Sequence, residues 1–213
     1  AAAQPNEIRH PLWQSSFIPH SADDPLRPEL RQRYPLESVL LPSTEAWDQA
    51  PDPDHLQRLS YQYCKTYLAE DILVKVDRAS MAVSLEARSP FLDPNVVACA
   101  VSLPSRMKLR YPRGRDSKFI LRKIMKGVLP DTILQRKKKG FGIPVAEWLK
   151  GPLRDRMCDL LDSNRIKHAG YFRSEVVSRL VEEHLRGRRD NRKSLWTLMS
   201  FEMWREEYGI RGR

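Results

Sequence analysis

The chain has 213 residues, of which 41% are hydrophobic and 30% are charged, and its formal net charge is +10. This length and composition suit one substantial folded domain or two small ones, and they exclude a chain that is disordered throughout. The positive charge allows nucleic acid, an anionic membrane surface or a phosphorylated substrate as a partner, but it does not choose among them.

Targeting signals are absent from the sequence. No run of about 18 apolar residues occurs, and the start, AAAQPNEIRHPLW, lacks the basic and apolar regions of a secretory signal. We therefore expect a soluble, cytoplasmic protein with no membrane contact. The three cysteines, Cys64, Cys99 and Cys158, are widely spaced, so they predict neither a disulfide framework nor a metal site. The first residue is Ala1 rather than methionine, which indicates a chain that was processed or cut from a longer one.

Residues 1–53 contain nine prolines and show little sustained periodicity. We expect an irregular, proline-rich segment there, with short helices over residues 28–33 and 36–41. From residue 54 onward the pattern becomes helical. The sequence therefore predicts a boundary after residue 53, followed by a helical region over residues 54–213.

Helical periodicity and capping residues divide residues 54–213 into successive helices. Asp52 or Asp54 is expected to cap the first helix, and Asp93 followed by Pro94 begins another. Asp116 or Ser117 is expected to cap a helix that Gly127 ends. Further helices are predicted over residues 71–83, 145–149, 153–161, 174–185 and 194–208. No alternating strand of useful length is visible, so the predicted fold is mostly α.

The helix predicted over residues 71–83 carries an unusual set of charges. Its main buried face is expected to hold Ile72, Val76, Ala79 and Val83. On the other side Asp77 lies between Leu73 and Met81, where a carboxylate is costly to desolvate without a cation or hydrogen-bond donor. Asp71 and Lys75 have the spacing and order of a favourable helical ion pair.

The stretch SLEARSPFLD follows this helix. Pro90 pushes Ser89 toward extended backbone, and in an extended segment Glu86 and Arg88 point to the same side. One interpretation of these charges is a structural ion-pair network that ties helices together. The other is a site for an anionic, phosphorylated substrate. The spacing alone does not decide between them.

Several motifs in order resemble one family. DILVKVDRASMAVSLEARSPFLD and KFILRKIMKGVLPDTILQRKKKGFGIPVAEWLKGPL closely resemble the C-terminal half of the synthetase domain of glutamine-dependent asparagine synthetases. RRDNRKSLWTLMSFEMW resembles the closing helix of that family, and the resemblance covers residues 54–204. It implies the helical C-terminal part of an ATP-pyrophosphatase domain of the adenine-nucleotide α-hydrolase type, whose parallel sheet is absent from this chain.

The resemblance also implies the chemistry. The family uses ATP to adenylate the side-chain carboxylate of aspartate, releases pyrophosphate, and attacks the acyl adenylate with ammonia derived from glutamine. Such chemistry needs cations that face the phosphates and carboxylates that hold Mg²⁺. ATP and Mg²⁺ are therefore expected in the full-length enzyme, although tight binding to this chain alone is not.

Individual positions carry over from the resemblance. Lys138 matches the lysine that faces the α-phosphate and the leaving group, and the neighbouring Lys137 and Lys139 leave the register open by one residue. Gly140 and Gly142 match a loop that brings the backbone close to a ligand. Lys138 and Glu86 are the predicted catalytic residues. The predicted supporting residues along the cleft are Lys75, Asp77, Arg78, Arg88 and Lys118, with Arg122 as a further partner for phosphate or carboxylate.

Other family motifs are missing from the sequence. The nucleophilic N-terminal cysteine of the glutaminase domain is absent, as are the serine-glycine-glycine-x-aspartate-serine phosphate loop and the acidic glycine-rich metal segment. No GxxxxGK loop replaces them. We therefore expect the C-terminal piece of a larger synthetase that does not make asparagine alone, and whose incomplete cleft favours self-association of the isolated chain.

Three alternatives remain at this point. A related ATP-dependent amidotransferase or cyclase would use another acceptor, such as a β-lactam precursor, a lasso peptide or a polysaccharide. A helical nucleic-acid-binding protein would use RKKK and RGRRDNRK on phosphates, but no helix-turn-helix or RNA-binding aromatic motif accompanies these charges. A non-catalytic helical scaffold would dock on a partner that carries the nucleotide domain.

Overall fold

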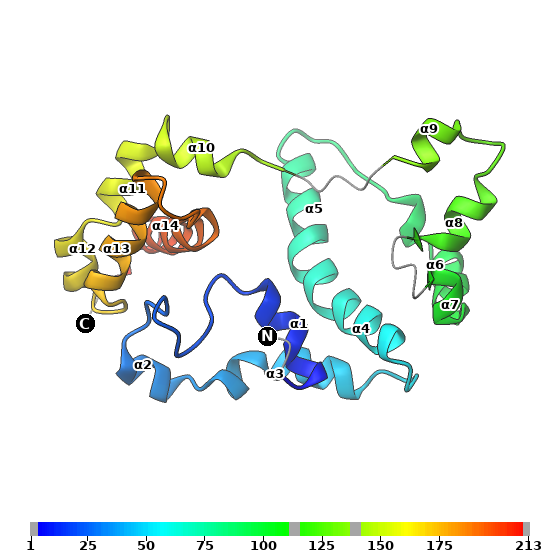
Figure 1. The fold of residues 1–213 in the computed structure, drawn as a ribbon, viewed down its shortest axis with the longest axis horizontal. Coiled ribbons are helices and arrows are strands. Elements are labelled where there is room, and N and C mark those ends of the chain that lie inside the picture. The colour runs from blue at the N-terminus through cyan, green and yellow to red at the C-terminus, as the bar shows by residue number, and fades with distance from the viewer. Residues whose placement is uncertain (1–3, 111–115, 137–141, 211–213) are drawn as a thin grey trace. The chain divides into compact units, whose positions relative to one another are not determined.

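The computed structural model describes residues 4–110, 116–136 and 142–210. It forms two compact units (Figure 1). Unit 1 comprises residues 1–40 and 141–213, and unit 2 comprises residues 41–140. The mostly helical fold predicted from the sequence is confirmed, since the described residues contain only two two-residue strands and two isolated bridges besides the helices. None of the described helices is long and apolar enough to span a membrane. The predicted boundary after residue 53 stays a prediction.

The N-terminal part of the chain is more helical than the prolines suggested. Helix α1 (Asn6–Gln14) was not predicted, and α2 (Pro28–Arg33) has the predicted bounds. Helix α3 (Leu36–Asp48) runs seven residues past the predicted end at residue 41, with Pro42 inside it. Pro42 has no N–H group, so the carbonyl of Ser38 loses its helical hydrogen-bond partner. Because Ser38 is exposed to solvent, the helix tolerates this loss, and the prediction that it ends at residue 41 was wrong.

Asp24 fixes the loop between α1 and α2. Its buried carboxylate accepts two 2.9 Å hydrogen bonds from Arg31 Nη2 and further bonds from the backbone N–H groups of His20 and Leu26. Burial alone would raise the pKa of Asp24, but these bonds outweigh burial and hold the pKa below its ordinary value. The next residues pair with the C-terminal helical region, because Arg173 N–H donates to Pro25 O at 2.7 Å.

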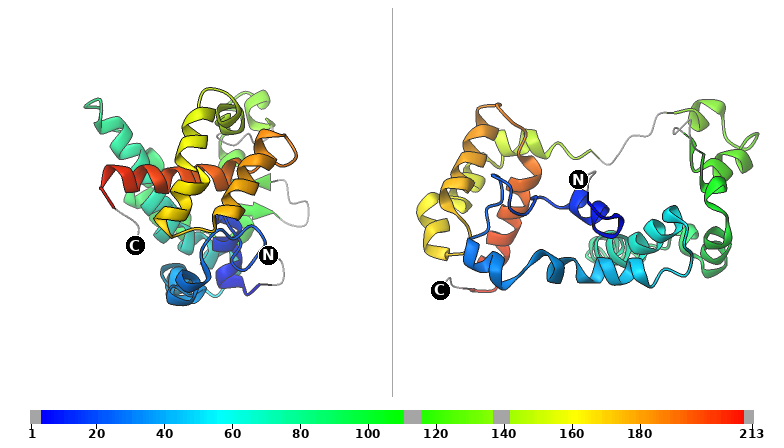
Figure 2. Two further views of the ribbon diagram at one scale, coloured as in Figure 1. Left: turned by 90° about the vertical axis from the view of Figure 1, so that its left-hand side faces the viewer. Right: turned by 60° about the horizontal axis from the view of Figure 1, so that its bottom comes forward.

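The core of unit 1 is formed by the C-terminal helices (Figure 2). Helix α14 (Arg192–Glu207) packs against α10 (Val145–Lys150), α11 (Arg154–Leu160) and α13 (Ser174–Leu185). These four helices were predicted, α13 with the same bounds. The packed side chains are apolar and almost fully buried, among them Leu149, Met157, Leu160, Val177, Leu180, Leu195 and Leu198.

Helix α12 (Ser163–Ala169) was missed from the sequence, although its signals are present. Asp162 caps it by accepting bonds from the N–H groups of Asn164 and Arg165, and Gly170 ends it with φ of 74°. The helix has only seven residues, so its apolar periodicity is too short to stand out.

After α3, whose residues 41–48 belong to unit 2, the chain forms one unbroken helical stretch. Helix α4 (His55–Tyr63), a π-helical segment (Cys64–Leu73) and α5 (Val74–Met81) follow one another without a turn. Asp54 caps α4, as predicted, by accepting bonds from Leu56 and Gln57 N–H. The expected separation into two helices was wrong, because nothing between residues 63 and 74 breaks the helix and the wider π turns accommodate the change of register.

The remainder of unit 2 is a series of short elements. A 3-10 helix (Pro90–Leu92) precedes α6 (Pro94–Ser102), which Asp93 caps as predicted. Helix α7 (Ser105–Lys108), strand β1 (Leu109–Arg110), strand β2 (Asp116–Ser117), helix α8 (Phe119–Ile124) and helix α9 (Asp131–Leu134) follow.

The predicted cap of α8 was wrong. Asp116 and Ser117 form β2, which pairs antiparallel with β1, and Lys118 stands at the N-cap with φ of 61° and no side-chain cap bond. Helix α8 begins at Phe119, so Asp116 and Ser117 lie before its N-cap position. Gly127, predicted to end this helix, adopts a φ of 83° after α8.

Candidate functional site

The end of α5 is a Schellman turn that sets the direction of SLEARSPFLD. Leu85 N–H donates to Ser80 O at 3.0 Å and Ser84 N–H donates to Met81 O at 2.9 Å. This pair of bonds is the Schellman pattern, and Ser84 has the left-handed φ of 58° that the pattern requires. Because glycine rather than serine is favoured there, the turn holds a strained residue next to the predicted site.

Glu86 and Arg88, predicted to point to the same side of an extended segment, form an ion pair. Arg88 donates to Glu86 Oε1 at 2.7 Å in the irregular segment after the turn. The two side chains are 69% and 85% exposed, so this pair contributes about 0–1 kcal/mol to stability. The pair is therefore positioned for solvent or for a partner rather than for holding the unit together.

The environment predicted for the helix charges was wrong. Asp77 is exposed rather than enclosed by Leu73 and Met81, and it forms no ion pair within the part of the chain that the structure describes. On the face expected to be buried, Val76 is 46% exposed and Val83 is 74% exposed. Within the described part of unit 2, the substantial contacts of α5 are with the π-helical segment that precedes it, so much of this face stays exposed.

The helical pair of Asp71 and Lys75 forms as predicted, at 3.4 Å between exposed side chains. Like the pair of Glu86 and Arg88, it joins residues close in sequence. The interpretation of these charges as a network that ties separate helices together is thus wrong for the described residues. Arg78 is also exposed and has no ion pair among them.

Lys118 and Arg122 lie at the start of α8, where Arg122 N–H donates to Lys118 O at 3.0 Å. Neither side chain forms an ion pair with the α5 carboxylates among the described residues. Gly142 is exposed and has open space around its Cβ direction. Lys138 and Gly140 lie outside the described residues, so their predicted roles stay predictions, as do the roles of the other site residues.

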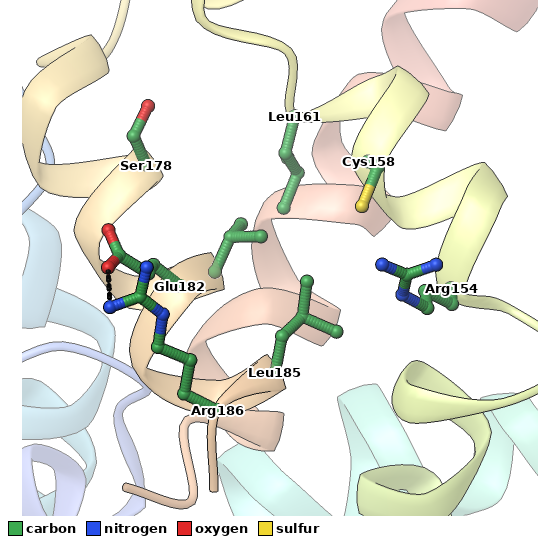
Figure 3. Close-up of a pocket in the computed structure, with 8 residues that line it drawn as sticks. Arg154, Cys158, Leu161, Ser178, Glu182, Leu185 and Arg186 are labelled. Atoms are coloured by element: carbon green, nitrogen blue, oxygen red, sulfur yellow. Dashed lines mark ion pairs between the residues drawn. The ribbon is translucent and has the colours of Figure 1, made fainter. Parts of the chain in front are cut away.

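Among the residues that the structure describes, no three His, Cys, Asp or Glu side chains are close enough to hold a metal ion together. The described residues therefore supply no cluster of three such ligands for Mg²⁺. In unit 1 a cavity of about 510 Å³ lies between α11 and α13 (Figure 3), with Arg154 and Cys158 on one wall and the ion pair of Glu182 and Arg186 on the other.

A cavity in unit 2 was missed by the sequence. It has a volume of about 680 Å³ and lies beside α4 and α6, with Cys64, Val97 and Lys108 on its wall. Its lining residues come from places up to 58 positions apart, from Ala50 to Lys108, so no local motif indicated it.

Three cations of the second basic run, RGRRDNRK, have partners elsewhere in unit 1. Arg186 contacts Glu182 at 2.8 Å, Arg189 contacts Asp23 at 2.6 Å, and Lys193 Nζ donates to the carbonyls of Gln14 and Ser15. These contacts use charges that duplex binding would need, so they disfavour the nucleic-acid interpretation.

Comparison with known proteins gives one family. The family model for asparagine synthase matches residues 3–206. No solved structure matches the chain. The first 53 residues, which resembled the family only weakly by motif, lie mostly within the matched range.

Curated relatives agree with the family model. The chain is 32% identical over 149 residues to a glutamine-hydrolysing asparagine synthetase of Bacillus subtilis, covering 70% of this chain and 23% of the relative. It is 36% identical over 152 residues to a putative asparagine synthetase of Mycobacterium tuberculosis, covering 71% and 22%. An amidase of Gibberella zeae is 29% identical over 115 residues, covering 52% and 17%. The chain spans less than a quarter of these relatives, and over that span it belongs to the asparagine synthase family.

Proposed function

We propose that this chain is the C-terminal portion of a glutamine-hydrolysing asparagine synthetase. The observation that carries the proposal is the exposed, charged turn after α5, which lies within a family match over residues 3–206. The synthetase names of the Bacillus and Mycobacterium relatives support the same reaction.

The reaction proceeds in two displacements. An oxygen of the aspartate side-chain carboxylate attacks the α-phosphorus of ATP, and pyrophosphate leaves. Ammonia then attacks the acyl carbon, loses a proton to a base and expels AMP, which leaves asparagine. Negative charge accumulates on the phosphates in the first step, so a positioned cation stabilises that transition state more than the ground state.

The predicted residues have separate roles in this proposal. Lys138 stabilises the charge that develops on the α-phosphate and the departing pyrophosphate. Glu86, held by Arg88 at 2.7 Å, positions the amine or accepts its proton. Lys75, Asp77, Arg78 and Lys118 are exposed charges, and we assign them to substrate positioning. The backbone hydrogen bonds of the Schellman turn set the direction in which the chain leaves α5, and they thereby position Glu86.

None of these residues is assigned as a ligand of Mg²⁺. When bound, it would neutralise phosphate charge, but the described residues offer no cluster of ligands for it. The proposal assigns no Mg²⁺ ligand to this chain. It places the glutaminase and the phosphate loop outside the sequence, so the chain alone is expected to be inactive.

The experiment measures aspartate-dependent exchange of pyrophosphate into ATP by the full-length protein that contains this sequence. Lys138→Ala is expected to lower the exchange rate at least about 100-fold, the usual effect of losing one transition-state donor. Lys167→Ala, an exposed lysine of α12, is the matched control and should leave the rate unchanged. Normal exchange in Lys138→Ala would contradict the assigned role, and a loss in Lys137→Ala or Lys139→Ala instead would correct the register.

A different acceptor is the second candidate, because fungal amidases are among the relatives. In that case the same adenylation chemistry would act on a carboxylate other than that of aspartate. Exchange that depends on another carboxylate and ignores aspartate would favour this candidate over asparagine formation.

A further inference from the structure

Side-chain hydrogen bonds connect the walls of the unit 2 cavity beside α4. Gln57 Nε2 donates to the carbonyls of Val101 and Leu103 at 3.2 and 3.0 Å, and this joins α4 to the end of α6. Ser105 Oγ also donates to Asp54, the cap of α4. Side-chain bonds to backbone thus hold the two helices on either side of the cavity, whose volume is about 680 Å³. That volume is within the range of small-molecule sites.

Lys108 brings a positive charge to this cavity. Its Nζ donates to Gln57 Oε1 and to Val101 O, so both acceptors are neutral, and an ammonium has three donors. It forms no ion pair in the described part of the chain, although Asp52 and Asp54 act on it from farther away. Burial lowers the pKa of Lys108, and those carboxylates and Cys64 oppose this effect. A half-buried ammonium with neutral partners is stabilised by an anion.

The rest of the cavity wall favours an apolar body. Val97 is 38% exposed and Val101 is 58% exposed, and both lie on the wall with Tyr61 and Pro53. Covering these side chains removes apolar surface from water. Asp52, also on the wall, disfavours a ligand with several negative charges.

We propose that this cavity binds a small hydrophobic monocarboxylate. Its carboxylate accepts a hydrogen bond from Lys108 Nζ, and its aromatic or aliphatic body packs against Val97 and Val101. All lining residues belong to unit 2, and the inference does not depend on the proposed synthetase reaction.

Cys64 provides a local reporter. It is a free, exposed thiol on the cavity wall, and Cys99→Ser with Cys158→Ser leaves it as the single cysteine. The rate of its alkylation by neutral iodoacetamide is measured in the 213-residue chain, with phenylacetate or with uncharged 2-phenylethanol. Phenylacetate is expected to slow alkylation at least about fivefold at saturation, because it covers the thiol, and 2-phenylethanol at equal concentration is not.

The lysine is tested in the same background. Lys108→Met should raise the phenylacetate concentration needed for half protection about tenfold or more, the effect of losing a charged hydrogen bond. Lys108→Arg should restore much of the protection, and Lys123→Met, an exposed lysine of α8, should change nothing. Circular dichroism checks that each variant is folded.

Three outcomes would overturn the inference. The first is no protection by phenylacetate. The second is equal protection by 2-phenylethanol, which would mean that the carboxylate is not recognised. The third is equal protection by inorganic phosphate, which would mean a simple cationic surface. If Lys108→Met does not fold, the comparison of the two phenyl ligands with Lys108 intact still decides.

Discussion

Unit 1 and unit 2 are both built from short helices, but they bury their apolar side chains to different extents. In unit 1, α10, α11, α13 and α14 enclose a core in which Leu149, Met157 and Leu195 are completely buried. Among the described residues of unit 2, Trp47 is the only large apolar side chain that is buried, while Val83, Leu85 and Phe91 are more than 60% exposed. An apolar stripe on a helix marks a face that is expected to pack against another element. In unit 1 its own helices pack against these faces, whereas in the described part of unit 2 the apolar faces stay largely exposed.

One ion pair from each unit shows a similar difference. Glu202 and Arg205 of unit 1 meet at 2.8 Å with exposed fractions of 0% and 10%, whereas Glu86 and Arg88 of unit 2 are largely exposed. A buried pair belongs to the packing of its unit, because breaking it leaves a desolvated charge. An exposed pair costs little to rearrange and is free to meet a substrate or another part of the protein.

The largest expected effect distinguishes the two units by their cores. Leu195→Ala should lower the free energy of unfolding of unit 1 by about 2–5 kcal/mol, because it opens a cavity in a closed core. Leu85→Ala, at a residue 61% exposed in unit 2, is the matched change and should cost less than about 0.5 kcal/mol. Urea unfolding followed by hydrogen exchange of each unit measures both, and equal losses would contradict the contrast.

A smaller effect is expected from the buried carboxylate of unit 1. Asp24→Asn should lower the free energy of unfolding at pH 7 by about 1–3 kcal/mol, because Arg31 loses a charged acceptor. The folded pKa of Asp24 lies below its unfolded value of about 3.9. Its stabilisation is therefore fully present above that unfolded value and is lost as the pH falls through the folded pKa.

Urea unfolding of unit 1 between pH 2 and pH 7 measures this dependence. Asp24→Asn should flatten the acid limb of the stability curve, and Asp77→Asn, at an exposed aspartate of unit 2, should not change it. An acid limb that keeps its full slope in Asp24→Asn would exclude Asp24 as its source.

The smallest expected effect concerns the turn next to the candidate site. Ser84→Gly should raise the free energy of unfolding of unit 2 by about 0.5–1 kcal/mol, because glycine adopts a φ of 58° without a Cβ penalty. Ser84→Ala keeps the penalty and is the control. The gain appears as slower hydrogen exchange of the Ser84 and Leu85 amides, and faster exchange in Ser84→Gly would argue against the Schellman turn.

Local signals predicted much of the fold. Asp54 and Asp93 act as helix caps, and α2 and α13 have the predicted bounds, because a cap or a helical stripe depends on neighbours in sequence. The misses have local and nonlocal causes. Pairing of β1 with β2 took Asp116 and Ser117 out of the cap position, and this pairing depends on a second segment.

The sequence by itself determined the helical fold class, the family, the local pair of Asp71 with Lys75 and the shared side of Glu86 and Arg88. Each rests on residues near one another in the chain or on ordered motifs. Only the tertiary structure decided which apolar faces are covered, that Asp77 is exposed, and that Cys64 and Lys108 share a cavity. Whether a residue is buried depends on which other residues pack against it in the tertiary structure. A periodic pattern specifies the face but not its partner.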